Sequence, residues 1–354
     1  MSRLRVSPPA IALLAAALFG AGFPLSKLLL EDLKPLTLAG LLYLGSGLGL
    51  GLVRGIVRRS RPGGEAPLKK SDLGWLLGVV LAGGVAGPVL LLFGLSRSSA
   101  HVSALLANTE TLFTVLLALL FFGDFLLRRE ALGSAILFAG ATLVAWAGSA
   151  ASGSSSWSGP LLLLGAGLAW GLDNNFSQRL SGRDPFQVAS LKGLIAGVVN
   201  LALAWGTEGL PPVHAKTIAF ALAVGLLSYG LSIVLFMTAL RHLGAARTSS
   251  LFATSPVMAI GLSWALLGEI PGALTLAGAG LMLPGAWLLI RSDHSHRHAH
   301  EAIEHEHRHI HDEHHRHPHE GGEGPEPHSH PHRHEPLVHD HSHAADLHHR
   351  HPHS

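Results

Sequence analysis

The chain has 354 residues, of which 48% are apolar and 14% are charged, and its formal net charge at pH 7 is +2. Soluble domains carry about 25% charged residues, so this composition excludes an ordinary soluble protein and indicates an integral membrane protein. The sequence contains no cysteine, which excludes disulfides, iron–sulfur clusters and cysteine-type zinc sites. We expect the lipid bilayer as its main partner and no binding of nucleic acid.

Ten segments are apolar enough to cross a bilayer, which takes roughly 20 residues per helix. The first segment follows a basic start and could pass for a secretory signal, but more spans follow at once, which favours an uncleaved first helix. In chain order the predicted spans are 9–30, 35–53, 73–95, 102–122, 131–149, 160–179, 186–205, 217–240, 248–267 and 272–290.

The short links between the spans differ in charge. If the N-terminus is cytoplasmic, nearly all Lys and Arg of the links face the cytoplasm, and the outer links keep only Lys34, Arg97 and Lys216. Cytoplasmic links of membrane proteins carry such an excess of positive charge. We therefore expect a multi-pass protein of the cytoplasmic (inner) membrane with both termini in the cytoplasm.

The chain is built twice, because the pattern of 105–124 returns in 250–269 at an offset of 145, with Asp124 answering to Glu269. Each half holds an odd number of spans, so the second half enters the membrane from the opposite side. Such an inverted repeat is typical of transporters whose site lies between the halves near the midplane. The predicted fold is an all-α membrane protein of two inverted five-helix repeats, with these parts: a first repeat (1–149), an outer linker (150–159), a second repeat (160–291) and a disordered His-rich cytoplasmic tail (292–354).

Motifs at corresponding places of the two halves resemble those of a known family. They are FGAGFPLSK and WGLDNNFSQR on the first helix of each half, the proline-led second helices, and NTETLFT…FFGD and ATSPVMA…LLGE on the fourth helices. In order and spacing they resemble the EamA-like group of the drug/metabolite transporter superfamily over about residues 8–290. The resemblance implies secondary transport rather than enzyme activity, and it leaves the substrate open. Thr111 departs from the proline common in the family, and Leu42 or Tyr43 departs from a common basic residue.

Glu110 is the first candidate for substrate binding, with Asn108 and Thr111 beside it. It lies about nine residues from the outer end of its helix, which is roughly 13 Å deep at 1.5 Å per residue. An ionised carboxylate at such a depth costs on the order of 3 kcal/mol, and burial favours the neutral acid. The position suits a proton-coupled step or an amine-bearing substrate, and the alternative is a structural carboxylate bonded to a neighbouring polar side chain.

Asp173 and Lys192 are predicted to pair, because both lie roughly 10 Å from the cytoplasmic edge on adjacent antiparallel helices. Pairing reduces the cost of burying either charge. The pair is either a static tie between two helices or a gate and substrate contact. Four further residues fall in apolar helices and are candidates for the same site, with helix packing or surface exposure as the alternative for each: Asn174, Asn175, Trp170 and Lys27. We expect His101 to lie at the surface near the outer end of its helix.

The tail holds all but three of the 26 histidines of the chain and few apolar residues, so we expect it to be disordered. Neutral imidazole suits Ni²⁺, Zn²⁺, Co²⁺ and Cu²⁺, although transport itself is expected to need no cofactor. The candidate ligands, without a fixed geometry, are His294, His296, His298, His300, His305, His307, His309, His311, His314, His315, His317 and His319.

Three functions remain open from the sequence. The favoured one is export of a small organic metabolite, either proton-coupled or facilitative, and the second is transport of a divalent transition metal gathered by the tail. The third is a membrane-anchored metal store or sensor. Isolated acidic residues in the spans, without several ligands at one depth, disfavour metal transport. Association of two copies into a homodimer also stays open.

Overall fold

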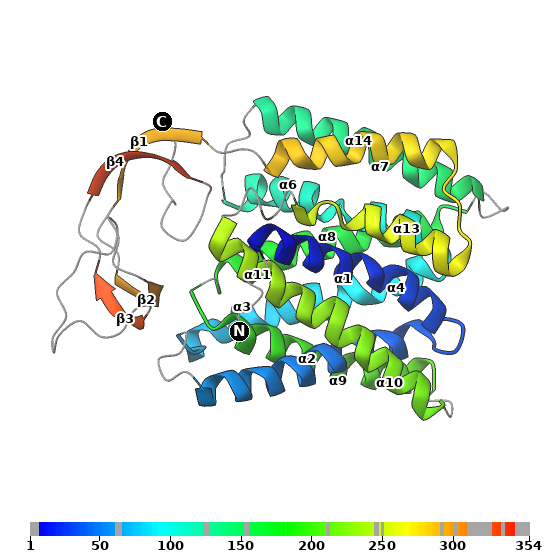
Figure 1. Ribbon diagram of the computed structural model, residues 1–354, viewed down its shortest axis with the longest axis horizontal. Coiled ribbons are helices and arrows are strands. Elements are labelled where there is room, and N and C mark those ends of the chain that lie inside the picture. Colours follow the sequence, from blue (N-terminus) through cyan, green and yellow to red (C-terminus); the bar gives the residue numbers. More distant parts are fainter. Residues whose placement is uncertain are drawn as a thin grey trace, which may run out of the picture.

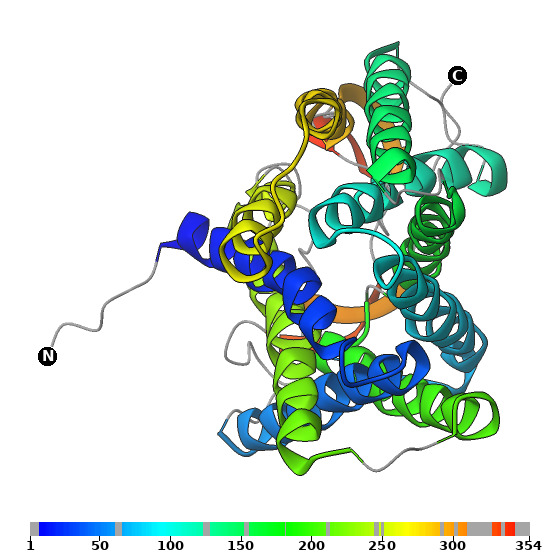
Figure 2. The ribbon, with the colours of Figure 1, turned by 90° about the vertical axis from the view of Figure 1, so that its right-hand side faces the viewer.

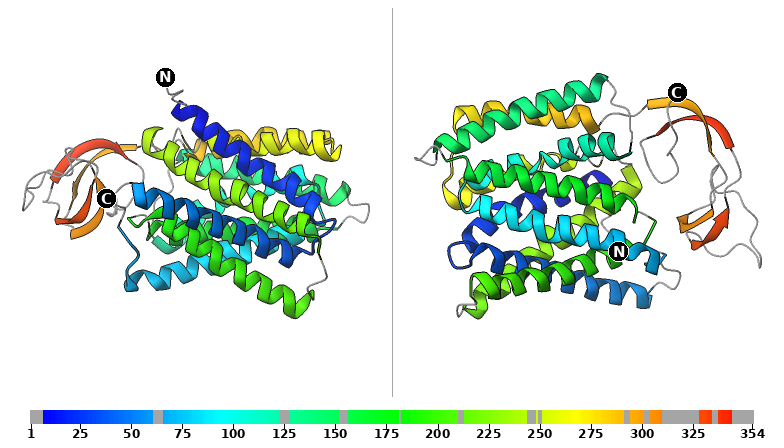
Figure 3. Two further views of the ribbon diagram at one scale, coloured as in Figure 1. Left: turned by 60° about the horizontal axis from the view of Figure 1, so that its bottom comes forward. Right: turned by 180° about the vertical axis from the view of Figure 1, so that it is seen from behind.

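The structure is a computed structural model, and it describes residues 7–60, 66–122, 128–151, 156–180, 182–209, 213–243, 248, 251–290, 294–300, 304–309, 328–333 and 337–343. Up to residue 290 the described chain forms a bundle of roughly aligned helices, and short strands follow beyond one end of the bundle (Figure 1, Figure 3).

Helices occupy every predicted span, which confirms an all-helical membrane domain. The first half contains α1 (Pro8–Leu29), α2 (Pro35–Ser60), η1 (Lys70–Asp72), α3 (Leu73–Val79), η2 (Val80–Ala86), α4 (Gly87–Leu95), α5 (Ala100–Ala107), α6 (Glu110–Phe122) and α7 (Arg128–Ala151). The second half contains α8 (Ser158–Gln178), α9 (Pro185–Thr207), α10 (Ala215–Val224), η3 (Gly225–Leu231), α11 (Ser232–Leu243), α13 (Ser255–Leu267) and α14 (Ala273–Ile290).

Seven helical stretches of the described chain are long and apolar enough to cross a membrane by themselves. Helix α8 is not among them, because Asp173, Asn174 and Asn175 lower its hydropathy. Helices α13 and α14 are apolar but shorter. The three polar residues of α8 thus mark the span that most needs protein, rather than lipid, around it.

Capping residues explain where several helices begin and end. Pro185 opens α9, and the Asp184 carboxylate accepts hydrogen bonds from the backbone N–H groups of Phe186 and Gln187 at 3.0 and 3.2 Å. Helix α13 ends at Gly268, whose φ of 66° lies in the left-handed region that favours glycine. The sharp stop sets the start of the link to α14.

The two halves interlock through corresponding helices. Helix α2 packs along α9 and α7 packs along α14, and these two pairs form opposite edges of the bundle (Figure 1, Figure 2). Between the edges, α1 packs against α11 and α13, while its counterpart α8 packs against α4 and α6. Each contact has a partner when the halves are exchanged, as an inverted repeat requires.

Facing glycines bring the edge pairs close together. A β-carbon built on Gly47 of α2 would lie 2.5 Å from the backbone nitrogen of Leu194, and one on Gly193 of α9 would lie 2.7 Å from the Gly47 Cα. At the other edge, a β-carbon on Gly140 would lie 2.7 Å from the Gly278 carbonyl oxygen. Such close backbone contacts are typical of tightly packed membrane helices. Both edges therefore resist separation.

Irregular backbone repeats at the same offset as the sequence. The third span of each half contains a π-helical segment, η2 and η3, and their first residues, Val80 and Gly225, are 145 positions apart. The fourth span of each half breaks at two turn residues, 108–109 and 253–254. Irregular backbone is tolerated at membrane depth where protein or a polar cavity surrounds it. These segments consequently point to the functional centre.

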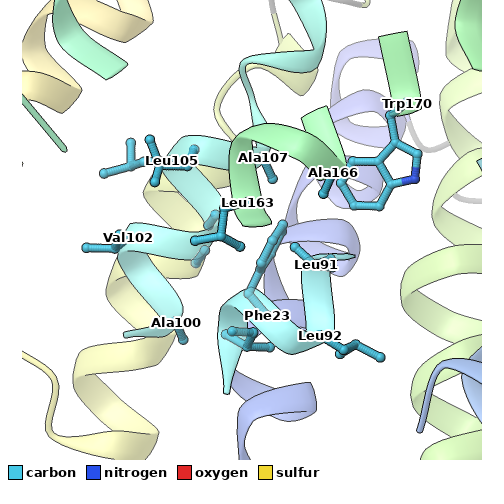
Figure 4. Close-up of a cluster of buried hydrophobic side chains, with 14 of the residues drawn as sticks. Phe23, Leu91, Leu92, Ala100, Val102, Leu105, Ala107, Leu163, Ala166 and Trp170 are labelled. Atoms are coloured by element: carbon cyan, nitrogen blue, oxygen red, sulfur yellow. The ribbon is translucent and has the colours of Figure 1, made fainter. Parts of the chain in front are cut away.

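Apolar side chains fill the region between α1, α4, α5 and α8. Figure 4 shows Phe23 of α1 lying among Leu91, Leu92 and Leu163, with Trp170 of α8 at one side of the group. All five side chains are buried. This packing fixes α8 against the first half, and so fixes the polar residues that α8 carries.

The tail differs from the prediction of disorder in four segments. The structure places strands β1 (His294–His300), β2 (Glu304–His309), β3 (His328–Arg333) and β4 (Leu337–His343) there. Strand β1 pairs antiparallel with β4, β2 pairs with β3, and six registered positions place histidine opposite histidine. The His-x-His alternation has the two-residue period of a strand, and pairing satisfies the backbone groups without an apolar core. Disorder elsewhere in the tail falls outside the described residues.

Candidate functional site

Both fourth spans break in the same way. In the first half, the Thr109 hydroxyl donates to the Leu106 carbonyl at 2.6 Å, and in the second half the Thr254 hydroxyl donates to the Leu251 carbonyl, also at 2.6 Å. Glu110 is therefore the first residue of α6, at a helix N-terminus inside the bundle. The partial positive charge of a helix N-terminus favours a carboxylate at this place.

Asp173 and Lys192 form the ion pair that the sequence predicted. The Lys192 Nζ lies 2.5 Å from Asp173 Oδ2, and the two side chains are 19% and 10% exposed. The pair rests against Gly83 of η2, where a β-carbon would come within 2.6 Å of the Lys192 Nζ and closer still to the Asp173 carboxylate. Residue 83 must lack a side chain for the pair to form there, so the second half supplies the charges and the first half supplies the space.

Glu110 lies on α6, which packs against α8 across the interface of the halves. Both Asp173 and Lys192 act electrostatically on its carboxyl group. Among the described residues, no side chain or backbone N–H donates a hydrogen bond to that carboxylate, and the side chain is partly buried. Glu110 thus lies within electrostatic range of the Asp173–Lys192 pair, and we call these three residues the charged cluster. Glu110 is the member whose carboxylate has no hydrogen-bond donor among the described residues.

The three asparagines predicted at the site divide into two roles. The Asn174 amide donates to the Thr114 hydroxyl at 3.1 Å, and the Asn175 amide donates to the Thr114 carbonyl at 3.1 Å and the Gly171 carbonyl at 2.8 Å. The two bonds to Thr114 join α8 to α6 next to the cluster, and the bond to Gly171 lies within α8, so these amides hold the cluster rather than extend it. The Asn108 amide nitrogen, in contrast, is buried without a partner among the described residues.

Of the other predicted site residues, Trp170 and Thr111 lie at the charged cluster or next to one of its members, and Lys27 lies elsewhere. The Trp170 indole donates to the Gly83 carbonyl at 3.3 Å, which places it at the cluster. Thr111 follows Glu110 in α6 and is partly buried. Lys27 instead donates to the carbonyls of Leu95 and Ser98 at 2.6 and 2.7 Å, so it caps the C-terminal end of α4. The structure does not bring Lys27 to the charged cluster.

Sequence reasoning missed Tyr43 as a site residue, although it noted the position as a departure from the family pattern. The Tyr43 hydroxyl donates to the Gly83 carbonyl at 2.6 Å, and its ring centroid lies 6.1 Å from that of Tyr229. The signal that could have found it is its alignment, within one residue, with Lys192 of the other half. Tyr43 links the charged cluster to an aromatic group, in which Phe19 lies 6.2 Å from Tyr229 and 5.3 Å from Phe252.

The repeat is asymmetric in charge. The positions that correspond to Asp173, Lys192 and Glu110 in the other half are Gly22, Leu42 and Ser255. Backbone packing is nevertheless conserved between the two interfaces, because Gly171 lies against Phe113 as Gly20 lies against Met258. One inter-half interface is therefore polar and charged, and its symmetry mate is neutral and aromatic. Together they suit a small molecule with a charged group and an apolar body.

His101 is buried rather than at the surface, which corrects the prediction. Its Nδ1 lies 3.3 Å from Glu269 Oε2, and the same oxygen accepts a bond from the Ala100 backbone N–H at 2.8 Å. Burial alone raises the pKa of Glu269, but the hydrogen bonds of His101 and Ala100 and the nearby charges of His101 and Lys27 outweigh it and leave the pKa below its usual value. The contact ties α5 of the first half to the C-terminal end of α13.

The histidines proposed as metal ligands fall in two groups. Seven of them lie on β1 and β2: His294, His296, His298, His300, His305, His307 and His309. The remaining five lie outside the described residues: His311, His314, His315, His317 and His319. In the antiparallel pairs β1–β4 and β2–β3, some of these seven histidines lie opposite histidines of the neighbouring strand.

Two inverted helical repeats with buried charges where they meet define a class, the multi-pass membrane transport proteins. The family model of the EamA-like transporters matches residues 8–146 and again 157–291. The chain belongs to the EamA-like transporter family, and it is a transporter of small molecules.

Two curated relatives and one solved structure resemble the chain. A protein of Methanothermobacter thermautotrophicus named as an uncharacterized transporter is 30% identical over 291 residues, which covers 78% of this chain and 83% of that one. A protein of Streptantibioticus cattleyicolor named as a probable terminal-alkyne amino-acid exporter is 30% identical over 207 residues, which covers 57% of this chain and 68% of that one. A crystal structure with 18% identity aligns at a TM-score of 0.57 over 80% of this chain and 96% of its own, and supports the fold.

Proposed function

We propose that the chain exports a small organic metabolite, an amino acid or a drug-like amine, across the cytoplasmic membrane by alternating access. The observation that carries this proposal is the Glu110 carboxylate, which has no hydrogen-bond donor among the described residues and lies within electrostatic range of the Asp173–Lys192 pair. A carboxylate buried in this way is costly unless a counter-charge or a proton joins it. The ammonium group of a substrate supplies that charge.

The neighbours of Glu110 suit the rest of such a substrate. Lys192 can bind a substrate carboxylate once its bond to Asp173 loosens, and the unpartnered amide of Asn108 offers a further donor. The apolar body of the molecule would lie toward Tyr43 and Tyr229, on the aromatic side of the interface. The curated relative named as an amino-acid exporter supports this substrate class.

Proton coupling follows from the same carboxyl group. Glu110 can hold a substrate ammonium or a proton, but one negative charge does not bind both at once. A cycle in which the proton enters as the substrate leaves would make export follow the inward proton gradient. Glu110→Gln keeps the size of the side chain and removes its charge, so it should stop both the transport of amines and its dependence on the gradient.

The orientation is part of the proposal, with both termini in the cytoplasm. The ion pairs Arg54–Asp184 and Asp72–Arg183, at 2.8 and 2.7 Å, lie where α2 and α8 end, and α14 ends at the same end of the bundle, next to the tail strands (Figure 1). A basic end of the bundle supports a cytoplasmic location.

Metal binding by the tail is a separate property, for which the pairing of histidine with histidine across the strands is the favouring observation. Imidazole binds Ni²⁺, Zn²⁺, Co²⁺ and Cu²⁺. Within the described side chains, no three His, Asp or Glu residues come together as metal ligands. The alternative of divalent-metal transport, or of a membrane-anchored metal store or sensor, therefore rests on the tail.

Transport into proteoliposomes tests the proposal. Purified full-length protein would be given ¹⁴C-labelled amino acids and organic amines one at a time, with and without an imposed pH gradient. Accumulation that the gradient drives in wild type and that Glu110→Gln abolishes would support the proposal. A chain ended after Arg291 is the matched control and should transport as wild type does. Equal accumulation by wild type and Glu110→Gln for every compound would overturn it.

A further inference from the structure

Helix α2 contacts both π-helical segments through two side chains on one face. The Tyr43 hydroxyl donates to the Gly83 carbonyl of η2, and the Ser46 hydroxyl donates to the Tyr229 carbonyl of η3 at 3.2 Å. Residues three apart on a helix are neighbours on its surface. A single face of α2 thus holds the irregular backbone of both halves.

The carbonyls of η2 are available because a π-helical turn displaces them from the regular bonding pattern. Three side chains from three helices satisfy them: Tyr43 and Trp170 donate to Gly83, and Asn200 donates to Gly84 at 3.0 Å. The bond from Tyr43, at 2.6 Å, is the shortest of the three. Tyr43 is only 7% exposed, so water cannot readily replace its hydroxyl if the bond is lost.

Gly83 connects this hydrogen bond to the charged cluster. Its carbonyl is held by Tyr43, while its α-carbon lies against the Asp173–Lys192 pair, with no room for a β-carbon between them. A shift of η2 therefore moves the surface on which the ion pair rests.

We propose that Tyr43 is a positioning residue of the transport site, whose hydroxyl holds η2 against Asp173 and Lys192 and so presets the charged cluster for substrate. This inference rests on the proposed transport function and names a residue that controls affinity. The hydroxyl need not touch the substrate. Loss of the Tyr43 bond leaves the Gly83 carbonyl with only the longer bond from Trp170, so η2 is held less tightly against the pair, and the Tyr43 bond sets how readily the cluster loosens during the transport cycle.

The test compares Tyr43→Phe with Ser46→Ala in full-length protein. Both changes remove one buried hydroxyl-to-carbonyl bond from the same face of α2, but only the first releases η2. With the labelled amino acid or amine that wild type transports best, Tyr43→Phe should raise KM by about five- to tenfold, the equivalent of one buried hydrogen bond, and change kcat less. It should also move the midpoint of the pH profile of transport. Ser46→Ala should leave KM within twofold of the wild-type value. Its pH profile should match that of wild type within experimental error.

A second readout needs no substrate. Because the chain has no cysteine, Ala82→Cys places a unique thiol on η2. Its labelling by a methanethiosulfonate reagent should be several-fold faster with Tyr43→Phe than with Ser46→Ala. Equal labelling in both backgrounds, or equal KM values and pH profiles, would overturn the role of Tyr43. If wild type transports none of the probes while the labelling difference is present, the proposed function fails and the mechanical role of Tyr43 stands.

Discussion

Removal of one member of the Asp173–Lys192 pair should destabilise the protein more than removal of both. Lys192→Met leaves the Asp173 carboxylate buried without its counter-charge, and breaking a buried ion pair in this way costs about 3–5 kcal/mol. The side chains here are 19% and 10% exposed, so some solvent screening remains. We expect a loss near the lower limit, about 3 kcal/mol, in the free energy of unfolding.

The double variant Asp173→Leu with Lys192→Met replaces the pair with apolar side chains of similar size. Such replacements are often neutral in stability, so the double variant should lose only about 1 kcal/mol relative to wild type. Denaturant titration in detergent, followed by tryptophan fluorescence, measures both. Transport should be lost in both, because each lacks the charges. If Lys192→Met and the double variant lose the same stability, or Lys192→Met loses less than about 0.5 kcal/mol, the pair does not offset the burial of its charges.

Three further predictions concern the packing of Gly83 against the ion pair, the contact between His101 and Glu269, and metal binding by the tail. Gly83→Ala inserts a methyl group into the ion pair and should cost about 1–3 kcal/mol and most of the transport, whereas Gly280→Ala, with open space around it, should be neutral or slightly stabilising in the same unfolding assay. His101→Ala removes a bond that holds the pKa of Glu269 low, so it should cost about 1 kcal/mol at pH 7. The difference from wild type should shrink as the pH falls through the lowered pKa of Glu269 and vanish once Glu269 is protonated in both; a constant difference would contradict this. Full-length protein should bind Ni²⁺ or Zn²⁺ in equilibrium dialysis and release it below about pH 6, when imidazole protonates, and a chain ended after Arg291 should not bind; equal binding by both chains would place the metal elsewhere.

The sequence was sufficient for the spans and for the repeat, because hydropathy and a constant offset are local and linear signals. It was also sufficient for the Asp173–Lys192 pair, since both residues lie at one depth on adjacent helices. It could not place Glu110 beside that pair, because the approach of α6 to α8 depends on the packing of non-adjacent helices. The family resemblance supplied the expectation of transport that the helices and comparisons support.

Other features depend on backbone conformation, which a hydropathy pattern does not reveal. The π-helical segments have ordinary apolar sequences, so the sequence could not show that the Gly83 carbonyl would accept a bond from Tyr43. His101 was predicted at the surface from its place near a helix end, yet the link after α13 brings Glu269 to it. In the tail, the low apolar content predicted disorder, whereas the alternating histidines formed paired strands.

The most direct test of the central claim asks whether substrate binds at Glu110. Asn108→Cys would place the unique thiol of the chain beside Glu110, and maleimide labelling would be followed with and without a transported amino acid or amine. We predict that the substrate slows labelling several-fold, and that adding Glu110→Gln removes this protection. Equal protection with Glu110→Gln, or no protection by a compound that wild type transports, would contradict binding at this cluster.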